Sequence, residues 1–192
     1  MDFELRDELA ELQATVRRLS QDKVEPRARE IDDTGEYPQD LFELFRDADL
    51  LGLCIPTAYG GSGAGILGLT LAIEEVAKYS NTAALMLLLT RLPTGPVMIA
   101  GSEEQKRRYL PGIADGSKRA AFGLSEPQAG SDVMGMRTRA TPGADGGWVL
   151  NGTKCWMSGV AQAECVVGVE KPVREHRASL HVPQAAGPAC ME

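Results

Sequence analysis

The sequence predicts an α+β fold, in which an all-helical N-terminal domain is followed by a partial antiparallel β domain. Two patterns support this prediction. Through about residue 118, apolar residues recur at steps of three and four, which is the period of an amphipathic helix. From residue 119, short apolar segments are separated by turn-forming residues, which is typical of strands. We therefore expect a helical domain over residues 1–118, a β domain over 119–170 and a tail over 171–192.

Two helices are expected in the first fifty residues. The first presents one apolar stripe, formed by Leu5, Leu9, Leu12, Val16 and Leu19. Pro26 is expected to break or restart this helix, because proline has no N–H for the helical hydrogen bond. A second helix should begin at Pro38, where the missing N–H would have no partner in any case, and Gly52 is its expected end.

A glycine-rich loop follows at residues 59–65. It precedes an expected helix over 66–79 and a buried helix that Asn81 would cap. Residues 63–68 formally match the dinucleotide-binding pattern G-x-G-x-x-G. That site requires a strand before the glycines and an acidic residue about 20 positions later, but position 88 is leucine. We therefore interpret these glycines as a loop at the entrance of a helix.

The last expected helix begins with a capping box. Ser102 is followed three residues later by Gln105, so that each side chain can bond to the other's backbone N–H. This helix should run through Tyr109 and end at Pro111.

The β domain is predicted from short apolar segments. Asn151 and Gly152 form the strongest two-residue hairpin signal, and they separate two of the candidate strands. The expected strands are 120–124, 136–141, 148–150, 153–157 and 163–169. After Lys171 neither periodicity is present, and the segment holds both histidines and three of the eleven prolines. We interpret 171–192 as an aberrant or disordered tail, which a frameshift or premature stop would produce.

Composition excludes several classes of function. With a net charge of −7, the chain lacks the Lys/Arg excess of a nucleic-acid-binding surface. Four cysteines without a Cys-x-x-Cys pair, together with only two histidines, argue against a metal site. The acidic N-terminus is no secretory signal. The most apolar stretch, 83–89, is far shorter than the ~20 residues of a membrane span. We expect a cytoplasmic protein with free thiols.

The loop at residues 125–132 is the strongest candidate site. It places two serines and two carboxylates directly after a buried strand, and a turn alone does not explain so many polar groups. No histidine lies nearby to activate Ser125 or Ser131, which argues against a serine hydrolase. Downstream, Trp156 and Ser158 would share one face of a strand, where a flat ring could stack on the indole. Taken alone, Trp156 fits a core position better than a cofactor wall.

Four segments together resemble the acyl-CoA dehydrogenase family. AFGLSEPQAGSD, at 121–132, resembles the first signature of that family, and GGWVLNGTKCWMS, at 146–158, resembles the hairpin that follows it. IPTAYGGSG at 55–63 is similar to its Tyr-Gly-Gly loop, and GSEEQK at 101–106 to its Glu-Glu-Gln-Lys helix. The four occur in the family's order, and the resemblance fades after residue 163.

The resemblance implies FAD as cofactor and an acyl-CoA thioester as substrate. It also implies a homo-oligomer, usually a tetramer, with electron-transferring flavoprotein as the electron acceptor. The residues implied at the flavin are Phe122, Leu124, Ser125, Trp156, Met157 and Ser158. Ser131 is implied at the acyl-CoA. Met157 replaces the family's usual isoleucine, and the Ser158 hydroxyl would be directed at flavin N5.

The implied reaction is α,β-dehydrogenation, in which a glutamate removes the α-proton while the β-hydride passes to the flavin. In the family that glutamate comes from a C-terminal helical bundle, which this sequence lacks, so no catalytic residue is assigned. We expect the isolated chain to be inactive. Two alternatives remain: a catalytically inactive remnant that serves as an interaction module, and a relative with acyl-CoA oxidase or flavin monooxygenase chemistry.

Overall fold

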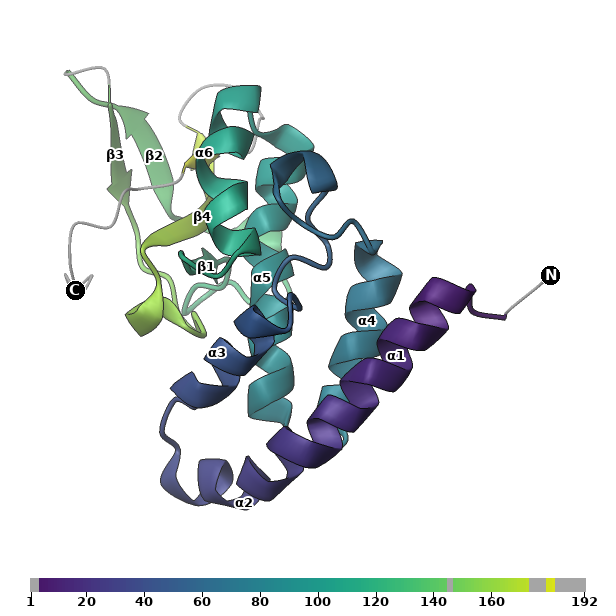
Figure 1. Cartoon of the computed structure of the whole chain (residues 1–192). Coiled ribbons are helices and arrows are strands. Elements are labelled where there is room, and N and C mark those ends of the chain that lie inside the picture. The colour runs from purple at the N-terminus through teal and green to yellow at the C-terminus, as the bar shows by residue number, and fades with distance from the viewer. Residues whose placement is uncertain (1–3, 145–146, 173–178, 182–192) are drawn as a thin grey trace. The chain divides into compact units, whose positions relative to one another are not determined.

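The computed structural model describes residues 4–144, 147–172 and 179–181. It divides the chain into two compact units. The first comprises residues 1–91 and 106–118, and the second comprises 92–105 and 119–192. The first is helical and the second holds the strands (Figure 1). Residues 92–105 belong to the second unit, although most of them are helical.

The first helix continues past its expected break by widening one turn. Helix α1 (Asp7–Leu19) passes into a π-helical turn, η1 (Ser20–Val24), and then into α2 (Glu25–Thr34). Pro26 occupies the start of α2. It cannot donate an N–H and its ring crowds the preceding turn, so a wider turn accommodates it without ending the helix. Gly35, at φ 66°, then caps α2 in the left-handed conformation.

Helix α3 (Gln39–Asp47) begins after Pro38 as expected but ends earlier than Gly52. Asp49 takes a left-handed conformation with φ 56°, and the chain turns there. Gly52 instead allows a close approach, since a Cβ there would lie 3.2 Å from the Gly61 backbone. At Gly61 a Cβ would lie only 1.9 Å from the carbonyl oxygen of Ile55. The glycines therefore close a tight loop around the short helix η2 (Thr57–Tyr59).

Helix α4 (Gly65–Ala77) follows this loop directly, as the sequence predicted. Helices α5 (Asn81–Ala100) and α6 (Glu103–Ala114) both run through prolines, at 93 and 96 in α5 and at 111 in α6. The expected end of α6 at Pro111 is therefore wrong, since the loss of one N–H donor does not stop a helix that packing supports. The capping box is confirmed, with Ser102 N donating to Gln105 Oε1 (2.8 Å) and Gln105 N donating to Ser102 Oγ (3.2 Å).

By length and composition alone, α5 is apolar enough to cross a membrane. The expectation that no apolar segment reaches that length was wrong, because the helix continues through Pro93. Half of its most apolar window is buried inside the fold, which is also the behaviour of a core helix.

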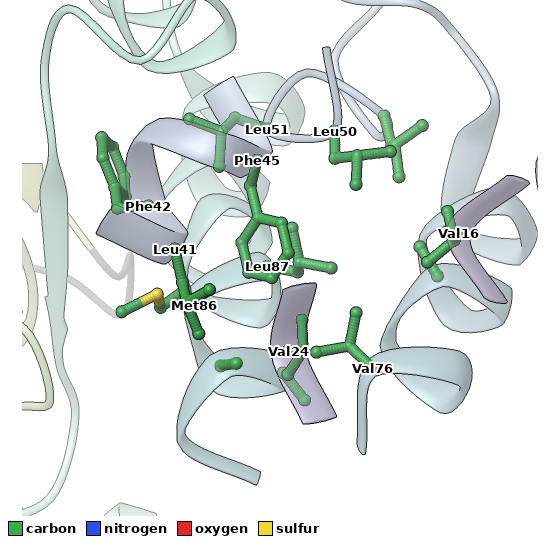
Figure 2. Close-up of a cluster of buried hydrophobic side chains, with 14 of the residues drawn as sticks. Val16, Val24, Leu41, Phe42, Phe45, Leu50, Leu51, Val76, Met86 and Leu87 are labelled. Atoms are coloured by element: carbon green, nitrogen blue, oxygen red, sulfur yellow. The ribbon is translucent and has the colours of Figure 1, made fainter. Parts of the chain in front are cut away.

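The core of the first unit lies between its helices. Phe45, Leu69 and Leu87 have no exposed surface, and Figure 2 shows Phe45 and Leu87 within the cluster. Helices α1, α3, α4 and α5 all contribute, as the 3.6-residue period requires when each buries one stripe. The labelled members of the cluster in Figure 2 are Val16, Val24, Leu41, Phe42, Phe45, Leu50, Leu51, Val76, Met86 and Leu87.

The second unit is built on a mixed sheet. Its strands are β1 (Ala120–Gly123), β2 (Arg139–Pro142), β3 (Trp148–Asn151), β4 (Cys165–Pro172) and β5 (Ser179–His181). They pair in the order β1-β4-β2-β3, and β5 pairs with β4. The β2–β3 pair is antiparallel, as expected for the β domain, and so is the unexpected β4–β5 pair, whereas β1–β4 and β2–β4 are parallel. Two short 3-10 turns, η3 (Val133–Gly135) and η4 (Val160–Gln162), lie between strands.

The expected hairpin at Asn151-Gly152 is wrong. Asn151 is the last residue of β3 and pairs with Arg139 of β2, so the hairpin turn lies between β2 and β3 instead. There Gly143 N donates to Gly147 O (2.8 Å). At Gly152 a Cβ would lie 2.2 Å from Thr138 Oγ1. Gly152 therefore allows two segments to approach closely and forms no two-residue turn.

The expected tail lies mostly outside the described residues. Its described parts belong to the sheet: β4 extends to Pro172, and β5 covers Ser179–His181. The expectation that no regular structure follows Lys171 was therefore wrong for these residues, since β5 adds to the sheet at β4. Periodicity missed β5 because a three-residue strand is too short to show it.

Candidate functional site

The structure brings the two candidate segments of the second unit together. Strand β1 ends at Gly123, and the chain continues into the loop that begins with Leu124 and Ser125. Ser125 O accepts a hydrogen bond from Cys155 N (3.0 Å), and Leu124 O accepts one from Lys154 Nζ (3.0 Å). The segment that carries Trp156 therefore lies against the segment that carries Ser125.

The two segments also approach closely at Gly123. A Cβ at Gly123 would lie 2.9 Å from Met157 Sδ and 3.5 Å from Lys154 Cγ. The absence of a side chain at this position lets the stem of Lys154 and the thioether of Met157 pack over the end of β1. Met157 is partly buried by this contact.

A buried ion pair joins the same segments. Lys154 Nζ lies 2.9 Å from Glu126 Oε1, and the two side chains are 7 % and 1 % exposed. Glu126 also accepts hydrogen bonds from the backbone N–H groups of Arg137 (2.6 Å) and Thr138 (2.9 Å). Gln128 Nε2 donates a further bond to it (2.5 Å). A buried carboxylate is tolerated when its oxygens are satisfied in this way.

These contacts keep Glu126 ionised. Burial alone would raise the pKa of Glu126, because it penalises the charged form. The hydrogen bonds from Thr138, Arg137 and Lys154 outweigh burial and hold the pKa of Glu126 well below its ordinary value. Glu126 therefore carries a permanent negative charge that neutralises Lys154.

The remaining carboxylate of the loop has a local structural role. Asp132 Oδ1 accepts a hydrogen bond from Gly135 N (3.2 Å) and so caps the short helix η3. Glu126 and Ala129 exchange two backbone hydrogen bonds of 3.0 Å each, which close the turn through Pro127. The sequence suggested that the polar groups of this loop bind a ligand. Its two carboxylates, Glu126 and Asp132, instead bond to other groups of the protein.

The other predicted site residues differ in exposure. Phe122, Leu124 and Ser125 are partly buried, whereas Ser131 and Ser158 are exposed. Trp156 is 90 % exposed, so it is not a core residue. The segment 152–157 is not a strand, and the argument that Trp156 and Ser158 share a strand face was therefore wrong. No contact among the described residues links Ser131 to the group around Gly123.

Trp156 has an unusual backbone. Its φ of 59° places it in the left-handed region, which residues other than glycine, asparagine and aspartate rarely adopt. Such conformations persist where the surrounding structure fixes them, and they gather at functional sites. Residues Lys154 and Cys155, immediately before it, are both anchored to the β1 end.

Lys154 was not among the predicted site residues, and the carboxylate of Glu126 was not expected to be bonded inside the protein. Lys154 lies between the predicted hairpin and Trp156, and nothing in the local pattern distinguishes it from an exposed lysine. The available signal was its position two residues before Trp156 in the predicted site, because a lysine buried there has to be neutralised.

Comparison with family models identifies the architecture. The model described as acyl-CoA dehydrogenase, N-terminal domain, matches residues 6–117, and the model for the middle domain matches residues 121–187. The chain belongs to the acyl-CoA dehydrogenase family. The middle-domain match continues well past residue 163, so the expectation that the resemblance fades there was wrong.

Curated relatives agree with this assignment. The chain is 36 % identical over 168 residues to the probable acyl-CoA dehydrogenase YngJ of Bacillus subtilis, which covers 87 % of this chain and 44 % of the relative. It is also 36 % identical over 164 residues to the mitochondrial isovaleryl-CoA dehydrogenase of Solanum tuberosum, covering 84 % of this chain and 40 % of that one. The chain therefore spans less than half the length of these relatives.

Solved structures show the same fold. Butyryl-CoA dehydrogenase from Megasphaera elsdenii superposes with a TM-score of 0.88 at 30 % identity, covering 98 % of this chain and 51 % of that one. An acyl-CoA dehydrogenase complexed with FAD from Bacillus anthracis gives 0.84 at 29 %, covering 94 % and 31 %. A chain in the structure of the electron transferring flavoprotein of Acidaminococcus fermentans gives 0.89 at 29 %, covering 98 % and 50 %. Members of the family bind FAD.

Proposed function

We propose that this chain forms part of a flavin site for the α,β-dehydrogenation of an acyl-CoA thioester. The observation that supports the proposal is the meeting of two loops in the second unit, through Cys155 N–Ser125 O and Lys154 Nζ–Leu124 O. Both loops carry the residues that the family resemblance implies at FAD. The family membership of the chain makes FAD the ligand to test first.

The residues present have the chemistry that an isoalloxazine ring requires. A flat ring can stack on the exposed indole of Trp156, while hydroxyl groups hydrogen-bond its polar edge. Ser125 and Ser158 are the proposed hydroxyl donors, and Phe122, Leu124 and Met157 the apolar surroundings. Ser131, an exposed residue near the end of the 125–132 loop, is the proposed contact to acyl-CoA.

When bound, FAD would accept the hydride from the substrate's β-carbon. The chain's own residues would bind and orient the two reactants. Neither carboxylate of the loop is proposed as the base that removes the α-proton. Glu126 is held ionised inside the protein by Lys154, and Asp132 caps η3. We therefore assign no catalytic residue to the described part of the chain.

The chain spans about half the length of its relatives, so the complete activity, the substrate and the partners remain proposals. We propose electron-transferring flavoprotein as the acceptor, a homo-oligomeric assembly and a cytoplasmic location. Relatives of equal identity differ in the acyl group they are named for: one is named for isovaleryl-CoA and another for no particular acyl group.

The chain's two tryptophans provide a direct test. FAD is titrated into the purified chain while tryptophan fluorescence is followed. Trp148 of β3 is half exposed and lies outside the proposed site, so Trp148→Phe is the control. Flavin binding should quench the emission of Trp148→Phe, in which Trp156 is the remaining tryptophan, and leave that of Trp156→Phe unchanged. Quenching confined to Trp156→Phe would contradict the proposed site.

Acyl-CoA then separates the candidate activities. Bleaching of bound flavin by an acyl-CoA would support dehydrogenation by the chain itself, and oxygen consumption would indicate the oxidase alternative. Flavin that binds without bleaching would support a binding half whose base is supplied from elsewhere. A chain that never binds flavin would support the alternative of an interaction module.

A further inference from the structure

We propose that Lys154 is the positioning residue of this site: its buried ammonium holds the Trp156-bearing segment against the end of β1. Its effect on flavin affinity rests on the proposed function, whereas its effect on the segment does not. Lys154 is not among the residues proposed above to contact the flavin or the acyl-CoA.

The geometry of Lys154 is that of a clamp between distant segments. Its single Nζ donates to Leu124 O at 3.0 Å and to Glu126 Oε1 at 2.9 Å. These acceptors lie 30 and 28 residues away in the sequence. Its stem passes over Gly123, where a Cβ would lie 2.9 Å from Met157 Sδ. One side chain therefore fixes how close the Trp156-bearing segment lies to the end of β1 and how that segment is oriented there.

Because Lys154 is buried, its charge has to be paired. An ammonium that is 7 % exposed has to be neutralised, and the described residues supply that charge through Glu126. Glu126 is in turn fixed by the backbone N–H groups of Arg137 and Thr138, at the entrance of β2. Lys154 is thereby tied directly to Leu124, just after β1, and through Glu126 to the two residues that precede β2. A conformation with the segment moved away would separate the Lys154 ammonium from Glu126 and leave the buried carboxylate without its counter-charge.

The clamp accounts for the conformation of Trp156. The left-handed backbone at φ 59° is unfavourable for tryptophan, and its exposed indole gains little from packing. The conformation is therefore imposed by its neighbours. Lys154 lies two residues upstream with its side chain fixed, and Cys155 one residue upstream with its N–H bonded to Ser125 O. Freeing Lys154 should let Trp156 leave this conformation.

The test compares Lys154→Met, Lys154→Arg and, as a matched control at an exposed lysine, Lys23→Met. Amide hydrogen exchange is measured without ligand. Lys154→Met should accelerate exchange across residues 152–159 by about tenfold or more, since local opening no longer breaks a buried pair. Exchange in β1 and β4 should stay near that of the control. Lys154→Arg, which keeps the charge, should restore most of the protection.

Flavin titration is the second readout. If FAD binds the parent chain, Lys154→Met should weaken its affinity by about tenfold. If the segment loosens but FAD binds no variant, the positioning role stands and the proposed function fails. Unchanged exchange at 152–159 in Lys154→Met would overturn the positioning role. Equal acceleration across β1 and β4 would overturn it too, because Lys154 would then stabilise the whole sheet. Should Lys154→Met not fold, Glu126→Gln provides the same comparison.

Discussion

Replacing Glu75 by glutamine should remove an acid-sensitive part of the first unit's stability. Glu75 of α4 has no exposed surface, and both of its oxygens are bonded to Arg17 of α1, at 3.2 Å to Nε and 3.0 Å to Nη2. Lys78 adds a third bond of 2.6 Å. Glu75→Gln keeps the shape of the side chain and removes its charge, so it isolates the electrostatic contribution.

The size of the effect follows from the pKa of Glu75. The hydrogen bonds from Arg17, opposed by burial and assisted by Lys78, lower the pKa of Glu75 from its ordinary 4.5 to about 2. At ~1.36 kcal/mol per pH unit, this corresponds to about 3 kcal/mol when the carboxylate is ionised. Both cations are about half exposed, and water screens them, so we expect about 1–2 kcal/mol in practice.

The direction of the pH dependence is fixed by the sign of that change. Because folding lowers the pKa of Glu75, its contribution is complete above about pH 4.5 and is lost as the pH falls toward 2. Glu75→Gln has no proton to gain there. The free energy of unfolding of the parent chain should therefore exceed that of the variant at pH 7, and the difference should shrink between pH 4.5 and pH 2.

Urea unfolding followed by far-ultraviolet circular dichroism, repeated across this pH range, measures the difference. Asp33→Asn is the matched control, since Asp33 pairs with Arg29 at 3.6 Å while both side chains are largely exposed. It should change stability little at any pH. A difference between parent and Glu75→Gln that stays constant, or grows, as the pH falls would refute the reasoning.

Two further predictions concern local backbone geometry. Gly61→Ala should destabilise the chain by more than about 2 kcal/mol, because its Cβ would meet the Ile55 carbonyl, whereas Gly130→Ala, with open space around it, should be nearly neutral in thermal unfolding. Ser102→Ala should cost about 1 kcal/mol, since it removes the acceptor for Gln105 N at the start of α6; equal stability in denaturant titration would contradict a working cap.

The helical half was largely predictable from the sequence, because its signals are local. The capping box at Ser102 and the glycine loop before α4 each act within a few residues, and the structure contains both. The helix ends were less predictable. Pro111 does not end α6 and Asp49, not Gly52, provides the left-handed turn after α3, because packing decides between several permitted stops.

The β half was less predictable, because its geometry depends on residues far apart. The Asn151-Gly152 pair has the composition of a hairpin turn, yet Gly152 is needed where the backbone passes Thr138. The parallel pairing of β1 with β4 joins segments more than forty residues apart, and no local sequence pattern predicts it. For the same reason the pairing of Lys154 with Glu126 could not be predicted from either segment alone.

The structure also narrows the argument for a ligand. The sequence suggested that a loop with two serines and two carboxylates needs a bound partner, but Glu126 and Asp132 are satisfied inside the protein. What internal bonding does not explain is the exposure of Trp156, an aromatic residue with 90 % of its surface open to solvent. An exposed indole contributes little to the stability of the fold, whereas a flat ring stacked on it would bury its apolar surface. Trp156 and the hydroxyls of Ser125 and Ser158 therefore support a flavin site more strongly than the charged groups of the loop do.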